Sequence, residues 1–189
     1  AVLTNNPAQA KRAARFRSHG IAREPEELER QDGPWYTEQH ELGFNYRLTD
    51  LQSALGTSQM RKLDAFIHRR REIAALYLTG LGDLAELTLP VVRPGVEPGW
   101  HLFVIRVNDA SRRRAFFEHL RAIGLGVQVH YLPVYLHPYY RRLGYQPGLC
   151  PIAEDWYARA ISLPMFPKMS NDDVASAIER IRQSARKIL

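Results

Sequence analysis

The later part of the chain alternates between strand and helix patterns, which constrains its fold more than any other feature. Branched and aromatic residues predict three strands: HLFVIRV (101–107), GVQVHY (126–131) and AISLP (160–164). Apolar residues at three-and-four spacing predict a helix that begins after Asp109 or Ser111 and ends at Gly124. A capping-box pattern from Ser170 opens a last helix. This order of elements predicts a small α/β sandwich.

The first 40 residues have a different character. AVLTNN (1–6) reads as the end of a strand that runs into a turn, and residues 7–18 predict a short helix with Pro7 at its first position. Residues 22–40 are polar and aromatic with little periodicity, and such long segments are either mobile or functional. Because a strand enters without a partner and no Met precedes it, we expect the chain to be the later part of a longer protein.

A long helical pattern follows Thr49 and Asp50, either of which can cap a helix. It continues to about Gly80, and we expect a break between Gly56 and Lys62. Its apolar face is predicted to comprise Leu51, Leu55, Leu63, Phe66, Ile67, Ile73, Ala74 and Tyr77. We therefore predict three parts: residues 1–60, a connecting helix over 61–82, and a small α/β domain over 83–189.

Composition narrows the classes of protein to consider. The chain has the 45% hydrophobic and 24% charged content of a globular protein, and no apolar run approaches the ~20 residues of a membrane span. Its one cysteine, Cys150, cannot form an internal disulfide, which favours a cytoplasmic location. The net charge of +6 suits an anionic small molecule or nucleic acid. The basic residues are scattered and no nucleic-acid-binding motif is present, so we expect neither nucleic-acid nor membrane binding.

Several kinds of catalytic site lack their motifs. The seven histidines do not follow the spacing of a zinc site, and no Walker loop or GxSxG elbow occurs. We therefore expect no metal site.

Two polar clusters are candidate ligand sites. Asn45, Tyr46 and Arg47 stand in a row before the helix that Thr49 or Asp50 caps, although Arg47 could simply form an ion pair with Asp50 or Glu41. The second cluster, His130 and Tyr131, lies at the end of a predicted strand, where α/β proteins place ligand groups. The alternative for His130 is a packed, hydrogen-bonded core histidine. Trp100 and His101 begin the neighbouring strand, and hydrophobic packing explains them equally well.

Two long runs of sequence carry a resemblance to a known family. The run from VLTNNPAQAKRAARFRSHGIARE to GPWYTEQHELGFNYRLTDLQSALGTSQMRKLDAFIHRRREIAALY resembles the middle of DegT/DnrJ-type nucleotide-sugar aminotransferases. The run from GVQVHYLPVYLHPYYRR to ISLPMFPKMSNDD resembles their C-terminal end. Within the family, PWYTEQHELGFNYRLTD is most similar to the transaminases of pseudaminic acid biosynthesis, which form UDP-4-amino-4,6-dideoxy-N-acetyl-altrosamine.

The resemblance implies a fold, a cofactor and a reaction. The fold would be the C-terminal part of the aspartate-aminotransferase fold (α/β, fold type I), with residues 1–60 as a remnant of the cofactor-binding large domain. The enzyme would be a homodimer that uses pyridoxal 5′-phosphate to move an amino group from glutamate to a 4-keto-6-deoxy nucleotide sugar. Its catalytic lysine would precede Ala1, so the chain would contain no catalytic residue and would be inactive alone.

The resemblance also implies roles for the two clusters. Asn45 would donate to the cofactor phosphate of the other subunit, because a neutral amide binds phosphate without adding a charge to be desolvated. Arg47 would offer a planar guanidinium to the anionic nucleotide sugar. His130 and Tyr131 would lie near the sugar-binding cleft. The alternative is a non-catalytic dimerisation or nucleotide-sugar-binding module without the lysine domain.

Overall fold

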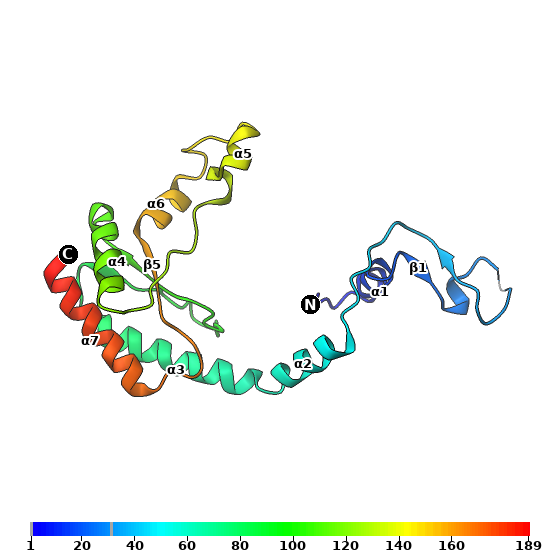
Figure 1. Cartoon of the computed structure of the whole chain (residues 1–189), viewed down its shortest axis with the longest axis horizontal. Coiled ribbons are helices and arrows are strands. Elements are labelled where there is room, and N and C mark those ends of the chain that lie inside the picture. The colour runs from blue at the N-terminus through cyan, green and yellow to red at the C-terminus, as the bar shows by residue number, and fades with distance from the viewer. Residues whose placement is uncertain (1, 31) are drawn as a thin grey trace. The chain divides into compact units, whose positions relative to one another are not determined.

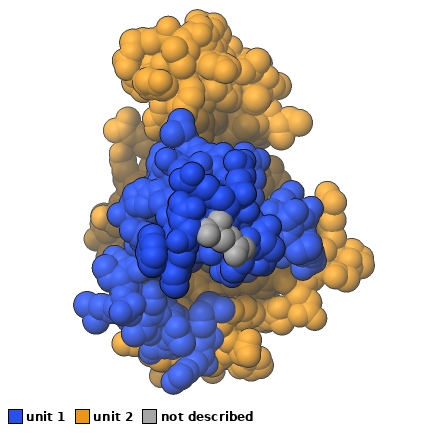
Figure 2. All heavy atoms as spheres, turned by 90° about the vertical axis from the view of Figure 1, so that its right-hand side faces the viewer, with its two compact units in different colours: residues 1–61 blue, residues 62–189 orange. Residues whose placement is uncertain are grey.

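The computed structural model describes residues 2–30 and 32–189, which form two compact units (Figure 2). Unit 1 extends to Arg61, and unit 2 begins at Lys62. The helix expected to connect two domains therefore groups with unit 2. The identification of residues 1–60 as part of a larger cofactor domain stays a prediction.

The described residues of unit 1 form two α-helices and a small antiparallel pair of strands. Helix α1 (Pro7–Phe16) is capped by the side chain of Asn6, and Pro7 stands at its first position, as expected. Strands β1 (Ile21–Ala22) and β2 (Glu38–Gln39) pair with each other, and the 3₁₀ helix η1 (Pro25–Glu27) lies between them. Helix α2 (Asp50–Met60) begins with the capping box that Thr49 and Gln52 form.

Unit 2 is built on a three-stranded antiparallel sheet in the order β3-β4-β5. Strand β4 (Phe103–Val107) lies in the centre, between β3 (Leu87–Thr88) and β5 (Ala160–Leu163). Alternate residues of β4 are fully buried, because one face of the sheet packs against helices. On the other face, Arg106 lies 5.1 Å from the centre of the Trp156 ring.

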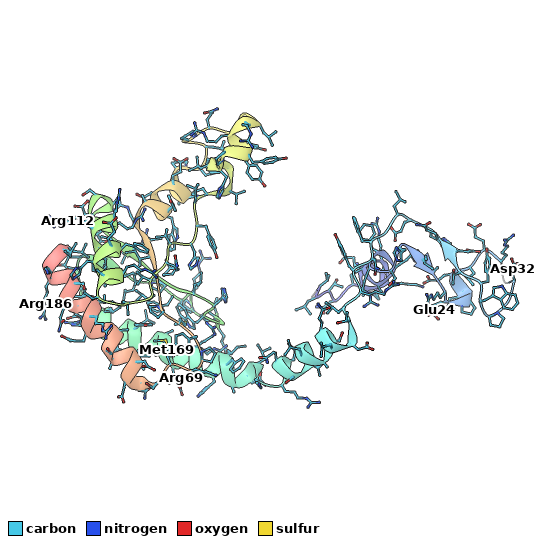
Figure 3. The ribbon with its side chains drawn as sticks, viewed as in Figure 1. Glu24, Asp32, Arg69, Arg112, Met169 and Arg186 are labelled. Atoms are coloured by element: carbon cyan, nitrogen blue, oxygen red, sulfur yellow. The ribbon has the colours of Figure 1, made fainter. Side chains whose placement is uncertain are left out.

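Three helices cover the buried face of the sheet (Figure 1). They are α3 (Leu63–Leu81), α4 (Arg113–Ala122), which the 3₁₀ helix η2 (Ala110–Arg112) precedes, and α7 (Asn171–Ile188), which packs against the other two. Residues from all three helices and from the strands form one core, in which the largest fully buried side chains include Tyr77, Phe103 and Phe116. Arg69 of α3 donates two hydrogen bonds to the Met169 carbonyl before α7 begins (Figure 3).

The segment between α4 and β5 leaves the core after Leu125 and Val127, which are buried in it. It contains the 3₁₀ helix η3 (Val134–Leu136) and the helices α5 (Pro138–Arg142) and α6 (Pro151–Arg159). The sequence patterns predicted none of these three, because their short apolar stretches lack helical periodicity.

Several predicted elements need correction. Residues 126–131 form no strand; they meet the sheet through one bridge, between Gln128 and Ser162. No strand occurs in residues 2–6, and Ala1 lies outside the described residues. The predicted apolar face of the long helical pattern is right for the buried Ile73, Ala74 and Tyr77, and right in part for Phe66 and Ile67, which are half-buried. It is wrong for Leu51 and Leu55 in α2 and for Leu63 at the start of α3, because all three are exposed. The break between Gly56 and Lys62 is confirmed, because α2 ends at Met60 and α3 begins at Leu63.

Candidate functional site

Asn45 and Arg47 lie on an extended segment that the backbone holds against the end of α1. Ser18 and Asn45 form an antiparallel bridge, and the Tyr46 N–H donates to the Arg17 carbonyl at 2.9 Å. The Asn45 side chain is exposed and has no hydrogen-bond partner within residues 2–30 and 32–189. Its position is therefore set by the backbone, while its amide remains available to a ligand.

Close backbone contacts before this segment require two glycines. A Cβ added to Gly43 would lie 2.2 Å from the Gly20 nitrogen, and one added to Gly20 would lie 1.7 Å from the Glu41 carbonyl oxygen. Gly20 also has a φ of +73°, which side chains disfavour. These contacts fix the approach of the chain to Asn45.

The ion pairs considered for Arg47 do not form. Glu41 instead pairs with Arg12, at 3.1 Å, and Arg47 forms no ion pair with Asp50. The Arg47 side chain is exposed and lines a pocket in unit 1. Its guanidinium is thus free to meet an anion.

His130 and Tyr131 are in unit 2, where a buried serine orients the histidine. The Nδ1 atom of His130 lies 2.8 Å from the hydroxyl of Ser162, which is on β5 and only 3% exposed. Among the described residues the Ser162 hydroxyl has no other partner, and a buried hydroxyl needs an acceptor. We infer that Nδ1 accepts the hydroxyl proton, which in a neutral ring places the ring's own proton on Nε2. The alternative of a packed, hydrogen-bonded core histidine is right only for the Nδ1 bond, because His130 is half-buried and Nε2 makes no hydrogen bond within the described part of the chain.

Tyr131 lies at an apolar pocket of about 590 Å³ in unit 2. The tyrosine is 72% exposed, and its ring meets the His130 ring edge-on at 4.5 Å between centres. The other wall is formed by the start of α6 and by Trp156. An apolar pocket beside a hydroxyl and an imidazole N–H suits a ring with polar substituents.

A polar network supports the far side of this pocket. Glu154 of α6 accepts hydrogen bonds from the Tyr135 hydroxyl and from the Gly148 N–H, the latter at 2.6 Å. The Tyr135 hydroxyl also accepts from the N–H of Cys150, which lines the pocket. Hydrogen bonding by Tyr135, followed by that of Gly148, lowers the pKa of Glu154, while burial and then Glu154 itself raise the pKa of Tyr135. Glu154 is thus an anionic anchor for the Cys150 loop.

Of the other two candidate residues, Trp100 packs as the alternative interpretation predicted, whereas the side chain of His101 is exposed. The Trp100 ring lies 5.5 Å from the Phe103 ring against the core, and the carbonyls of Trp100 and His101 accept hydrogen bonds from Arg70. Over residues 2–30 and 32–189, no group of three or more His, Cys, Asp or Glu side chains is placed to hold a metal ion. No helix in the same ranges has the length and hydrophobicity that crossing a bilayer requires.

Comparison with known proteins identifies the family. Residues 1–182 match the DegT/DnrJ/EryC1/StrS aminotransferase family. The chain belongs to this family. Its relatives include the spore coat polysaccharide biosynthesis protein SpsC of Bacillus subtilis, which is 36% identical over 87% of the chain and 43% of SpsC. The dTDP-3-amino-3,4,6-trideoxy-alpha-D-glucose transaminase of Streptomyces venezuelae is 33% identical over 100% of the chain and 46% of that enzyme.

Solved structures of family members confirm the α/β fold. PseC of Helicobacter pylori, an aminotransferase of pseudoaminic acid biosynthesis, matches with a TM-score of 0.83 and 28% identity over 97% of the chain and 48% of PseC. DesV of S. venezuelae matches with a TM-score of 0.81 and 31% identity over 97% of the chain and 46% of DesV. The chain spans about half the length of the relatives it matches, so its fold corresponds to part of an aminotransferase.

Enzymes of the DegT/DnrJ/EryC1/StrS family use pyridoxal 5′-phosphate, and the residues present fit one part of that group. The unpartnered amide of Asn45 suits its phosphate, because an amide N–H is a neutral donor. That none of the four lysines links to the cofactor stays a prediction. Lys11 is ion-paired with Glu27, and Lys62, Lys168 and Lys187 are exposed.

Sequence reasoning missed the residues that support the site. Ser162 carried a usable signal, since it is the one hydroxyl in the otherwise apolar segment AISL. The pairing of Ser18 with Asn45 carried none, because a single bridge leaves no periodic pattern.

Proposed function

We propose that this chain forms part of a pyridoxal-phosphate-dependent aminotransferase that moves an amino group from glutamate to a 4-keto-6-deoxy nucleotide sugar. The enzyme acts in the cytoplasm as a homodimer and serves the synthesis of surface sugars such as pseudaminic acid. Family membership and the similarity to PseC support this proposal. The observation that carries it is the free amide of Asn45 on a segment fixed by backbone pairing.

In this proposal, the residues of the chain bind and orient the cofactor and the nucleotide sugar. The cofactor, when bound, supplies the electron sink for amino transfer. The Asn45 amide donates to the cofactor phosphate, and the Arg47 guanidinium pairs with the anionic part of the nucleotide sugar. His130 donates from Nε2 to an oxygen of the sugar, because Ser162 keeps the ring proton on that atom. Tyr131 packs beside the sugar at the apolar pocket of unit 2.

Two variants test these roles in the protein with its upstream coding sequence restored. Asn45→Ala should weaken cofactor binding about ten- to a hundred-fold, since a hydrogen bond to a charged group contributes roughly 1.5–3 kcal/mol. Arg47→Ala should instead raise the KM for the nucleotide sugar while cofactor binding stays unchanged. Both side chains are exposed, so neither change should lower the melting temperature by much.

Either of two results would overturn the assignment of Asn45 and Arg47 as ligand-binding residues. If Asn45→Ala binds cofactor as tightly as the parent, or if both variants lose stability with unchanged affinities, these residues are structural.

A non-catalytic nucleotide-sugar-binding or dimerisation module is the second candidate. The contacts of the four lysines fit both candidates, since Lys11 is ion-paired and the other three lysines are exposed. Translating the DNA upstream of the codon for Ala1 discriminates the two candidates. An open frame that encodes a lysine followed by a glycine pair supports the aminotransferase.

A further inference from the structure

A pocket of about 420 Å³ within unit 1 gathers an excess of positive charge. Five cationic side chains and two carboxylates line it, which leaves three positive charges without a matching carboxylate. Two of the cations come from α1, and the others are Arg17 directly after α1, Arg23 directly after β1, and Arg47; one of the carboxylates is Glu24 (Figure 3). A concave surface with a net positive charge concentrates anions.

Two of the five cations of this pocket have a carboxylate partner. Glu27, whose side chain is 10% exposed, accepts a hydrogen bond from Arg15 at 2.6 Å and also pairs with Lys11. These two cations are thus already neutralised in part.

The other three cations are arginines without a partner. Arg17, Arg23 and Arg47 make no side-chain hydrogen bond or ion pair in residues 2–30 and 32–189. The Ser18 hydroxyl, which also lines the pocket, has no partner in the same ranges. Three guanidiniums at one pocket repel one another, and an anion bound between them would replace this repulsion with attraction. The pocket is therefore built for a ligand with more than one negative charge.

We propose that this pocket binds the diphosphate of the nucleotide sugar, with Arg17 and Arg23 joining Arg47 as its ligands. Guanidiniums bind phosphate oxygens through two parallel hydrogen bonds, and each phosphate of a diphosphate ester carries one negative charge. The Tyr46 N–H to Arg17 carbonyl bond holds the segments of Arg17 and Arg47 side by side. The identification of the diphosphate as part of a nucleotide sugar rests on the proposed function, whereas the proposal of an anion site does not.

Calorimetric titration of the whole chain with inorganic pyrophosphate tests the site without any enzyme activity. Arg23→Gln and Arg17→Gln should each weaken binding about ten-fold or more, as expected for losing hydrogen bonds to a charged group. Arg12→Gln is the matched control, because Arg12 lies on α1, pairs with Glu41 and does not line this pocket. It should change the affinity by less than about two-fold. Circular dichroism of each variant confirms that the fold is retained.

A comparison of ligands identifies the chemistry that the pocket selects. UDP and pyrophosphate should bind more tightly than UMP and inorganic phosphate, and added salt should weaken all four. If the single phosphates or pyridoxal 5′-phosphate bind as tightly as the diphosphates, the pocket takes one phosphate and the proposal is overturned. Equal weakening by Arg12→Gln, or no binding of pyrophosphate, would also overturn it. Amino-transfer activity is a separate measurement, so a failure of the proposed function would leave these results unchanged.

Discussion

Replacing Ser162 with alanine tests the hydrogen bond that orients the ring of His130. The change removes a hydroxyl that is 3% exposed and leaves Nδ1 of half-buried His130 without its donor, which lies at 2.8 Å in the parent. A buried polar atom that loses its partner costs about 1–3 kcal/mol. For a chain of this size, each kcal/mol lowers the melting temperature by roughly 2–4 °C. Thermal unfolding followed by circular dichroism measures this loss.

Ser184→Ala is the control, because Ser184 is also buried, at 1% exposure. Its hydroxyl donates to the Arg180 carbonyl one turn earlier in α7, so its removal leaves a backbone acceptor inside a helix. We expect a smaller loss than for Ser162→Ala. Nitrogen-15 NMR of the ring should report His130 Nδ1 as an unprotonated acceptor in the parent and a mixture of tautomers in Ser162→Ala. Equal losses of stability, or a proton on Nδ1 in the parent, would refute the reasoning.

Three further predictions concern the rest of the chain. The Arg182 hydrogen bond lowers the pKa of Asp83 to about 2, so the stability from this pair is present above the ordinary pKa of 3.8 and is lost as pH falls through about 2. The stability difference between the parent and Arg182→Gln should therefore disappear between those pH values in unfolding titrations. Gly43→Ala should disrupt the fold of unit 1, because its Cβ would lie 2.2 Å from a backbone nitrogen; unchanged amide NMR shifts around Asn45 would argue against this. The chain alone, treated with pyridoxal 5′-phosphate and borohydride, should give no single stoichiometrically modified lysine on peptide mapping, since Lys11 is ion-paired.

Local signals in the sequence were enough to predict the helices and strands that have strong periodicity or clear caps. The strand around Phe103 and the helix after Ser170 form as predicted, because burial on one face imposes a regular pattern on each. The segment ending at His130 has a strand composition but pairs with β5 through only one bridge, between Gln128 and Ser162. Composition reports the preference of a segment, whereas pairing depends on a partner far away in the sequence.

The candidate site was predictable only at the residues that carry the family resemblance. Asn45 and Arg47 could be named from their motif, but the pocket beside Arg47 needs α1 and β1 to meet, which no local pattern encodes. Likewise, the orientation of His130 depends on Ser162, 32 residues later. Contacts between distant segments are the part of a site that one sequence does not reveal.

The most direct test of the central claim is the transfer of labelled nitrogen. The protein with its upstream coding sequence restored is incubated with pyridoxal 5′-phosphate, ¹⁵N-glutamate and a UDP-linked 4-keto-6-deoxy sugar, and the products are followed by mass spectrometry. The account predicts a UDP-amino sugar that carries ¹⁵N, and a higher KM for the keto sugar in Arg47→Ala. A cofactor-bound protein that transfers no ¹⁵N to any keto nucleotide sugar would contradict it.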